Sequence, residues 1–216
     1  MSRIFFEVLT DAEKKELDHL RHFSKSGMLV GGTALALQIN HRRSYDFDVF
    51  FNEPLSSFFP GKAKRVFGKI EIIKDREGEE LTFMTKSGIK ITFFYYPFKP
   101  LFKKIPTDYI KLVSWKDIAL DKAYTIGRRA AYRDYVDLFF ILKKKCLALS
   151  WVIKNAKKKF GDLFSEKLFL GQLIYLKDVR PVRIEFVSEV VYREELERFL
   201  EKETSKYWKT KFTAPR

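Results

Sequence analysis

The stretch that decides the fold is residues 31–50, GGTALALQINHRRSYDFDVF, in which a pair of glycines is followed by a pair of aspartates. The apolar residues 28–30 before it suit a short strand, which the two glycines interrupt. Thr33 is expected to cap a helix over residues 33–38, because their small and straight-chain side chains favour helix. The stretch therefore predicts a strand, a glycine turn and a helix, followed by a second strand.

The second strand, expected over residues 45–51, places Asp46 and Asp48 on one face, because side chains alternate along a strand. Two carboxylates on one face are costly to bury unless a cation lies beside them. Carboxylates spaced in this way can hold one or two magnesium (or manganese) ions, which bridge a triphosphate and activate an attacking hydroxyl. The alternative interpretation is a solvated face of an edge strand.

The glycine turn suits phosphate, because glycines let backbone amides approach phosphate oxygens and the following helix adds the positive end of its dipole. Taken alone, Gly31 and Gly32 fit an ordinary strand-to-helix turn equally well. The P-loop motif, the dinucleotide-binding GxGxxG motif and the EF-hand loop do not fit this sequence. The turn and the aspartates together predict nucleotide chemistry.

The rest of the chain predicts an α+β fold, a small mixed β-sheet flanked by helices with a helical C-terminal lobe. The sheet-bearing lobe is expected over residues 1–107 and the mainly helical lobe over residues 108–216. Further strands are expected over residues 70–74, 81–85 and 89–95. Helices are expected over residues 10–25, 114–127, 131–145, 150–160, 165–176 and 193–206.

The composition is that of a folded and basic protein. The 216 residues are 46% hydrophobic, and 42 Lys and Arg against 28 Asp and Glu give a formal charge of +14. Such a charge attracts polyanions, which favours a nucleotide or nucleic-acid partner over a merely basic surface. The single cysteine, Cys146, is expected to be buried and suits a reducing compartment. Since no apolar run is long enough for a membrane span, a cytoplasmic protein is expected.

Residues 31–37 (GGTALAL) and 41–50 (HRRSYDFDVF) resemble the signature of the AbiEii/AbiGii-type nucleotidyltransferase toxins, a branch of the polymerase β-like nucleotidyltransferases. The similarity continues in residues 117–123 (DIALDKA) and 133–138 (RDYVDL). The resemblance implies a metal-dependent enzyme that moves a nucleoside monophosphate from an NTP to a hydroxyl acceptor. It further implies an RNA acceptor, with the 3′ end of tRNA as the leading candidate, and an antitoxin protein as partner.

The resemblance also assigns site residues by position. The metal ligands are Asp46 and Asp48, and the helical lobe completes the site with Lys122 and Asp137 as further catalytic residues. From the residues alone, Asp137 fits an exposed ion pair with Arg133, and Lys122 fits a solvated lysine on an amphipathic helix. The expected nucleotide-binding residues are Gly31, Gly32, Thr33, Arg43, Ser44 and Lys122.

One departure from the superfamily concerns the strand beside the aspartates. Many polymerase β-like enzymes carry a third acid there, where this chain has Thr92. A threonine cannot serve as a general base in the usual way, so Asp137 is expected to supply the missing carboxylate. The alternatives are a basic RNA-binding protein with a degenerate nucleotidyltransferase site, and a transferase that acts on a protein or a small molecule.

Basic residues gather in the helical half, where an RNA acceptor would bind if they share a surface. Aromatic side chains in the same half are available for stacking on bases. The alternative is a solubilising helical face. The basic residues are Lys143, Lys144, Lys145, Lys154, Lys157, Lys158, Lys159, Lys202, Lys206, Lys209 and Lys211, and the aromatic residues are Trp151, Tyr207 and Trp208.

Overall fold

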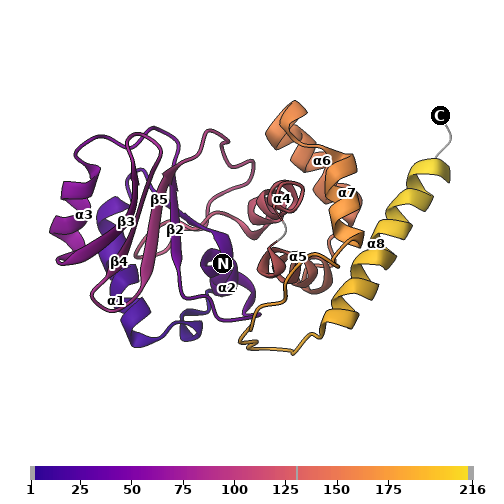
Figure 1. Cartoon of the computed structure of the whole chain (residues 1–216), viewed down its shortest axis with the longest axis horizontal. Helices are drawn as coiled ribbons and strands as arrows, with labels where there is room; N and C mark the ends of the chain where they lie inside the picture. Colours follow the sequence, from indigo (N-terminus) through magenta and orange to yellow (C-terminus); the bar gives the residue numbers. More distant parts are fainter. Residues whose placement is uncertain (1–2, 130, 214–216) are drawn as a thin grey trace. The chain divides into compact units, whose positions relative to one another are not determined.

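The computed structural model describes residues 3–129 and 131–213. The chain forms two compact units, Met1–Trp115 and Lys116–Arg216. The first unit contains a mixed β-sheet with helices, and helices make up the second unit, which confirms the α+β prediction (Figure 1). Residues 108–115 lie with the first unit, where the main-chain NH of Leu29 donates to Lys111 and its carbonyl accepts from Val113, both at 2.9 Å.

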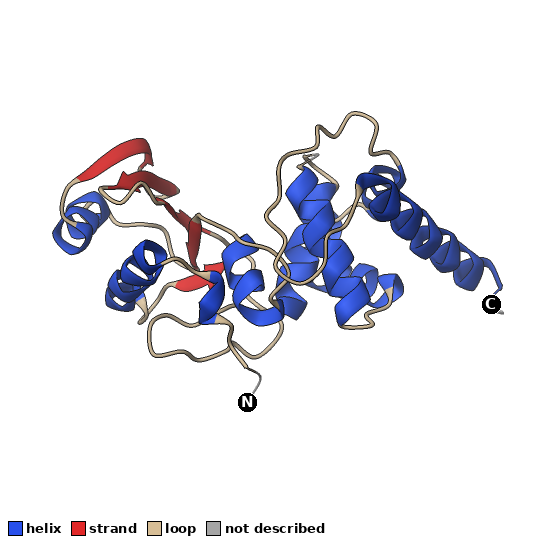
Figure 2. Cartoon of the chain, turned by 90° about the horizontal axis from the view of Figure 1, so that it is seen from below, coloured by secondary structure: helices blue, strands red, loops and turns tan. Residues whose placement is uncertain are grey.

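The sheet has five strands in the order β1-β2-β5-β4-β3, and the strands in the described part of the chain all lie in the first unit (Figure 2). β2 and β5 are parallel, whereas the other neighbouring pairs are antiparallel. A parallel pair requires a long crossover, here the chain between residues 51 and 90. The strands are β1 (Met28–Val30), β2 (Phe47–Phe51), β3 (Ile70–Arg76), β4 (Glu80–Thr85) and β5 (Lys90–Tyr95).

Local capping rules explain where the helices of the first unit begin. Thr10 and Glu13 form a reciprocal capping box, in which the Thr10 NH donates to the Glu13 carboxylate at 2.6 Å. One helix, residues 59–67, was not predicted, and it contains Pro60 and Gly61, which disfavour a helix interior. Pro60 lies in the first turn, where its missing NH costs nothing. The elements are η1 (Phe6–Val8), α1 (Asp11–His19), η2 (Leu20–Phe23), α2 (Gly31–Ile39) and α3 (Phe59–Phe67).

Apolar packing covers one face of the sheet. Side chains that alternate along β2, β4 and β5 are buried against Phe23, Phe59 and Phe67. The rings of Phe23 and Phe93, for example, have centroids 4.6 Å apart. Because neighbouring side chains point to opposite faces, the residues between them lie on the other face, and Asp48 is one of these. The buried apolar residues on this face of β2, β4 and β5 are Phe47, Val49, Phe51, Leu81, Phe83, Ile91 and Phe93.

The second unit packs its helices around the central helix α5, in which every residue from Tyr132 to Leu142 except Arg133 is buried. The last helix extends to residue 213, beyond the predicted end at 206. No helix among the described residues of either unit is both long and apolar enough to cross a membrane. The elements are α4 (Trp115–Ile126), α5 (Tyr132–Lys144), α6 (Leu149–Phe160), η3 (Gly161–Leu163), α7 (Glu166–Ile174) and α8 (Arg193–Thr213).

The expectation that Cys146 is buried is wrong. Its side chain is exposed, and its φ of 47° places it in the left-handed region directly after α5. The NH of Leu147 donates to the Leu142 carbonyl at 3.1 Å, so the chain reverses here in the manner of a helix C-terminal cap. The residue at such a reversal lies on the surface whatever its hydrophobicity.

Glu166, at the start of α7, joins three helices of the second unit. Its carboxylate accepts from the Tyr207 hydroxyl at 2.8 Å, from Lys211 Nζ at 2.5 Å, and from Lys157. Burial acts to raise the pKa of Glu166, but the hydrogen bonds from Lys157, Lys211 and Tyr207 outweigh it and lower the pKa to about 2. The charged form of this carboxylate therefore stabilises the packing of α6, α7 and α8.

Replacing Glu166 with glutamine is expected to lower the free energy of unfolding at pH 7 by about 1–2 kcal/mol. The full pKa shift would give more, but the paired lysines are about half exposed and solvent screens them. Because the folded-state pKa is depressed, this stabilisation is present above the ordinary value of 4.5 and is lost as the pH falls toward about 2. Urea unfolding between pH 7 and pH 3 measures it.

The matched control for this substitution is Glu201→Gln, which removes an exposed carboxylate from α8 and is expected to change little at any pH. A cost for Glu166→Gln that stays constant from pH 7 to pH 3 would contradict the role of the carboxylate charge.

Candidate functional site

The glycine turn and the aspartate pair meet at the junction of β1, α2 and β2. Gly31 has a φ of 71°, in the left-handed region, and a Cβ atom placed on it would lie 2.8 Å from Asp48 Oδ2. Asp48 is also the residue paired with Val30 across the two strands. Glycine is therefore required at position 31 for two reasons, the left-handed backbone conformation and the close approach of the Asp48 carboxylate.

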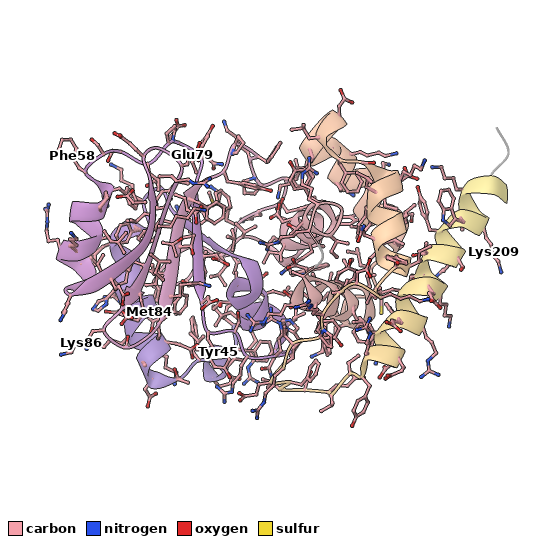
Figure 3. All side chains as sticks on the ribbon, viewed as in Figure 1. Tyr45, Phe58, Glu79, Met84, Lys86 and Lys209 are labelled. Atoms are coloured by element: carbon pink, nitrogen blue, oxygen red, sulfur yellow. The ribbon has the colours of Figure 1, made fainter. Side chains whose placement is uncertain are left out.

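Asp46 immediately precedes β2, two residues before Asp48. Its side chain is 36% exposed, and its Oδ2 atom lies 2.8 Å from Nζ of Lys90 on the neighbouring strand β5. Tyr45, the residue before it, is exposed at the surface (Figure 3). The two carboxylates, supplied by one strand, offer the hard oxygen ligands that magnesium and manganese prefer. The residues present therefore fit a divalent cation.

Thr33 does not cap the helix, which corrects the sequence prediction. α2 begins two residues earlier, at Gly31, so the hydroxyl of Thr33 lies within the first turn. Its Oγ1 atom is buried and donates to the main-chain carbonyl of Asp46 at 2.5 Å. Thr33 thereby fixes the backbone at the first aspartate. In this conformation its hydroxyl serves the protein chain and is not presented to a phosphate.

Arg42 lies against the glycine turn, a position that the sequence prediction had given to Arg43. A Cβ atom on Gly32 would come within 2.5 Å of Arg42 Nη2 and 3.0 Å of Ser44 Oγ. The Arg43 guanidinium instead donates to the main-chain carbonyl of Val8 at 2.9 Å. The basic turn thus brings Arg42 and Ser44 to the glycines, and no signal in the sequence distinguishes the two neighbouring arginines.

The strand beside Asp48 has no carboxylate at the matching position. Asp48 is in register with Thr92 on β5, as the alternation of side chains predicts. Thr92 is in turn in register with Thr82 of β4, whose hydroxyl donates to Glu80 at 2.9 Å. Glu80 is also held by Lys74 at 2.5 Å. Glu80, two residues before Thr82 on β4, is therefore already bound within the sheet.

In the second unit, Lys122 of α4 lies between two aspartates of α5. Its Nζ atom is 2.6 Å from Asp134 Oδ1 and 2.6 Å from Asp137 Oδ2. The side chains are 10%, 6% and 0% exposed, respectively, which excludes both an exposed Asp137 ion pair and a solvated Lys122. A buried ammonium between two carboxylates has a fixed position. The sequence prediction selected Lys122 and Asp137 but not Asp134 as their third member.

Lys159 forms a second buried cluster in this unit, although the sequence grouped it with surface lysines. Its side chain is 2% exposed and its Nζ atom lies 2.7 Å from Asp121 Oδ1 and 3.3 Å from Asp117 Oδ1. This cluster joins α6 to α4, the helix that carries Lys122. The spacing of lysines along α6 does not reveal which of them faces inward with a charged partner.

Several other members of the basic set are also engaged within the second unit. Lys143 pairs with Glu189 and Glu195, and Lys157 pairs with Glu166. Tyr207 donates its hydroxyl to Glu166, and Lys211 lies 5.4 Å from the centroid of the Trp208 ring. The positive charge of these lysines is thus partly neutralised by glutamates of the same unit. Exposed lysines on α6 and α8 are Lys154, Lys158, Lys202, Lys206 and Lys209, the last marked in Figure 3.

Replacing Gly31 with alanine is expected to lower the free energy of unfolding by about 1–3 kcal/mol, because the backbone is strained and the new methyl group meets Asp48 Oδ2. It is also expected to weaken manganese binding, since the carboxylate must move. Chemical unfolding and a manganese titration measure the two effects.

Gly88→Ala is the matched control. Gly88 has a similar φ of 76°, but no atom lies within 4 Å of the position of its Cβ. It therefore reports the backbone strain alone. Equal costs for the two substitutions and unchanged manganese binding would show that Asp48 does not depend on the close approach at Gly31.

The fold and the site together place the chain among the nucleotidyltransferases. A family described as "Nucleotidyl transferase AbiEii toxin, Type IV TA system" matches residues 17–214. The chain belongs to this family, and the resemblance carried by residues 31–50 is confirmed. It is therefore an enzyme of the nucleotidyltransferase class and a member of a toxin family of type IV toxin–antitoxin systems.

The chain is also similar to individual proteins. "Uncharacterized protein aq_aa25" of Aquifex aeolicus (strain VF5) is 32% identical over 185 residues, which cover 83% of this chain and 86% of that protein. JHP933 from Helicobacter pylori has a similar structure, with a TM-score of 0.54, 18% identity, and coverage of 95% of this chain and 97% of that one. A structure named "putative nucleotidyltransferase from H. pylori" has a TM-score of 0.56, 19% identity, and coverage of 94% and 99%. At these identities the two structures support the fold alone.

Proposed function

We propose that the chain uses a divalent cation on Asp46 and Asp48 to transfer a nucleoside monophosphate from an NTP to a hydroxyl of an RNA acceptor. The observation that carries this proposal is the contact at Gly31, where the phosphate turn directly meets a carboxylate of the metal pair. A triphosphate with a bound metal ion requires a phosphate-binding site directly beside a cation-binding site.

The reaction is a substitution at phosphorus. The acceptor hydroxyl oxygen forms a bond to the α-phosphorus, and the bond from that phosphorus to the oxygen bridging the α- and β-phosphates breaks. Pyrophosphate leaves with the bonding electrons, and the hydroxyl proton passes to water or a carboxylate. Magnesium or manganese on Asp46 and Asp48 supplies charge neutralisation and polarisation of the phosphate oxygens.

Other residues of the first unit are assigned to binding the phosphates or to supporting the site. We assign the Ser44 hydroxyl and the main-chain amides of Gly31 and Gly32 to triphosphate oxygens. Arg42 is buried, donates to the Arg43 carbonyl at 2.9 Å, and adds positive charge beside Gly32. Thr33 holds the backbone of Asp46 in place. Arg43 is assigned to the support of this loop, because its guanidinium is bound to the carbonyl of Val8.

We assign Lys122 of the second unit to the triphosphate, as the family resemblance implies, and Asp137 to the positioning of Lys122. Asp137 is fully buried and lies 2.6 Å from the ammonium, so it is better suited to hold the lysine than to accept a proton from an acceptor hydroxyl. This assignment replaces the interpretation of Asp137 as a substitute for the acid missing at Thr92.

An RNA acceptor accounts for the charge of +14 and for the exposed lysines of α6 and α8. A polyanion is attracted by such residues and its binding weakens with salt. The 3′ end of tRNA provides the hydroxyl that the reaction needs. As a member of a type IV toxin–antitoxin family, the chain is also proposed to act together with an antitoxin.

The test is to incubate the purified protein with total RNA and each α-labelled NTP in turn, with magnesium, manganese or EDTA. Label is expected on RNA of tRNA size, with one NTP preferred and none transferred in EDTA. Label on the protein alone would identify a transferase with a protein acceptor. Salt-sensitive RNA binding without metal-dependent NTP binding would identify a degenerate site, and either result would overturn the proposal.

A further inference from the structure

Lys90 places its side-chain amine beside the proposed metal site. It is the first residue of β5, the parallel neighbour of β2, and its Nζ atom lies 2.8 Å from Asp46 Oδ2. Two residues further along the same strand, Thr92 lies opposite Asp48. The neighbouring strand thus presents an ammonium at one aspartate and a hydroxyl at the other.

The charges on this face do not favour two divalent ions before nucleotide binds. Sites that hold two such ions place them roughly 3.5–4 Å apart, and the paired charges require several anionic ligands. Here the two carboxylates are already offset by the Lys90 ammonium and by the Arg42 guanidinium at the glycine turn. Glu80, the next carboxylate across the sheet, is bound to Lys74 and Thr82. The described residues of this face therefore offer a full set of anionic ligands for one divalent ion only.

We propose that Lys90 takes the place of a second divalent ion at Asp46, so that the site binds a single metal ion per chain. This inference rests on the proposed function, since it concerns the metal of that reaction. The ammonium neutralises one oxygen of Asp46 and donates hydrogen bonds, but it cannot polarise a phosphate oxygen as strongly as a divalent cation. Asp48 and the other oxygen of Asp46 would hold the one divalent ion.

The half-exposed Lys90 pair has a structural counterpart on the same sheet face. Lys74 and Glu80 form a pair of 2.5 Å, with side chains 40% and 25% exposed, against 39% and 36% for Lys90 and Asp46. The two ion pairs are alike in length and exposure, but only the Lys90–Asp46 ion pair includes one of the two proposed metal ligands. Lys74→Met is therefore a matched control for Lys90→Met.

The experiment counts bound Mn²⁺ by electron paramagnetic resonance, without nucleotide and with a non-hydrolysable NTP analogue. The wild-type protein is expected to bind one Mn²⁺ per chain. Lys90→Met is expected to bind Mn²⁺ about tenfold more tightly, because a positive charge has been removed within a few ångströms. Lys90→Asp, which adds a carboxylate beside Asp46, is expected to bind a second ion in the presence of the analogue.

Lys74→Met is expected to leave both the affinity and the count unchanged, and Lys90→Arg is expected to keep a count of one. Two ions in the wild-type protein, or identical results for Lys90→Met and Lys74→Met, would overturn the inference and leave the proposed function standing. Unchanged Mn²⁺ binding by an Asp46→Asn, Asp48→Asn double variant would instead contradict the proposed function. Thermal unfolding verifies that each variant is folded.

Discussion

Asp48→Asn is expected to lower the rate of nucleotidyl transfer by about a thousandfold or more, because the loss of a metal ligand removes several kcal/mol of transition-state stabilisation. The same substitution is expected to leave the fold intact. Asparagine has the shape of aspartate, so the contact with Gly31 is retained without the charge. Incorporation of labelled nucleotide into RNA measures the rate, and urea unfolding measures the stability.

Glu80→Gln is the matched control for this loss, since Glu80 is a carboxylate on the same face of the sheet and is bound to Lys74. It is expected to keep nearly the full rate, and its exposed ion pair is worth at most about 1 kcal/mol. Transfer by Asp48→Asn at a rate near that of Glu80→Gln would show that the aspartate pair does not hold the reactive metal.

Lys122→Met is expected to destabilise the second unit by about 3–5 kcal/mol, because it leaves Asp134 and Asp137 buried without their cation. It is also expected to abolish transfer. The loss of activity of the single variant therefore does not distinguish a lysine that contacts nucleotide from a lysine that only holds the fold together.

A triple variant, Lys122→Met with Asp134→Asn and Asp137→Asn, separates the two effects. It removes the buried charges together, so most of the stability is expected to return while transfer stays absent. A triple variant that transfers nucleotide at the wild-type rate would exclude Lys122 from the reaction. A single Lys122→Met variant with wild-type stability would show that the buried cluster contributes little.

The sequence predicted the elements whose signals are local. The alternation of residues 45–51 and the break at Gly31 were enough to place the strand, the turn and the aspartate pair, since each depends on neighbouring residues alone. The helix α3 was not predicted; its Pro60 lies in the first turn, which tolerates a proline. The predicted end of α8 came too early. Its last turns are held by hydrogen bonds from Tyr207 and Lys211 to Glu166, which lies on another helix and leaves no signal in the local sequence.

The remaining site residues depend on pairings that no local pattern encodes. Lys90 meets Asp46 only because β2 and β5 pair in parallel, across a crossover of about forty residues. Asp134 joins Lys122 because α4 and α5 pack with these faces together. The inward position of Lys159 likewise follows from its contacts with α4. Such residues can be identified from a family resemblance or from the fold, but not from periodicity.

The hydrogen bond from Thr33 to the carbonyl of Asp46 couples a helix to the strand beside it. Transient opening of the first turn of α2 breaks this bond and releases the backbone that presents the carboxylate. Local opening of this kind is what amide hydrogen exchange reports. We therefore expect a ligand that engages the glycine turn to slow exchange at the start of β2 as well, because the Thr33 hydroxyl joins the two segments.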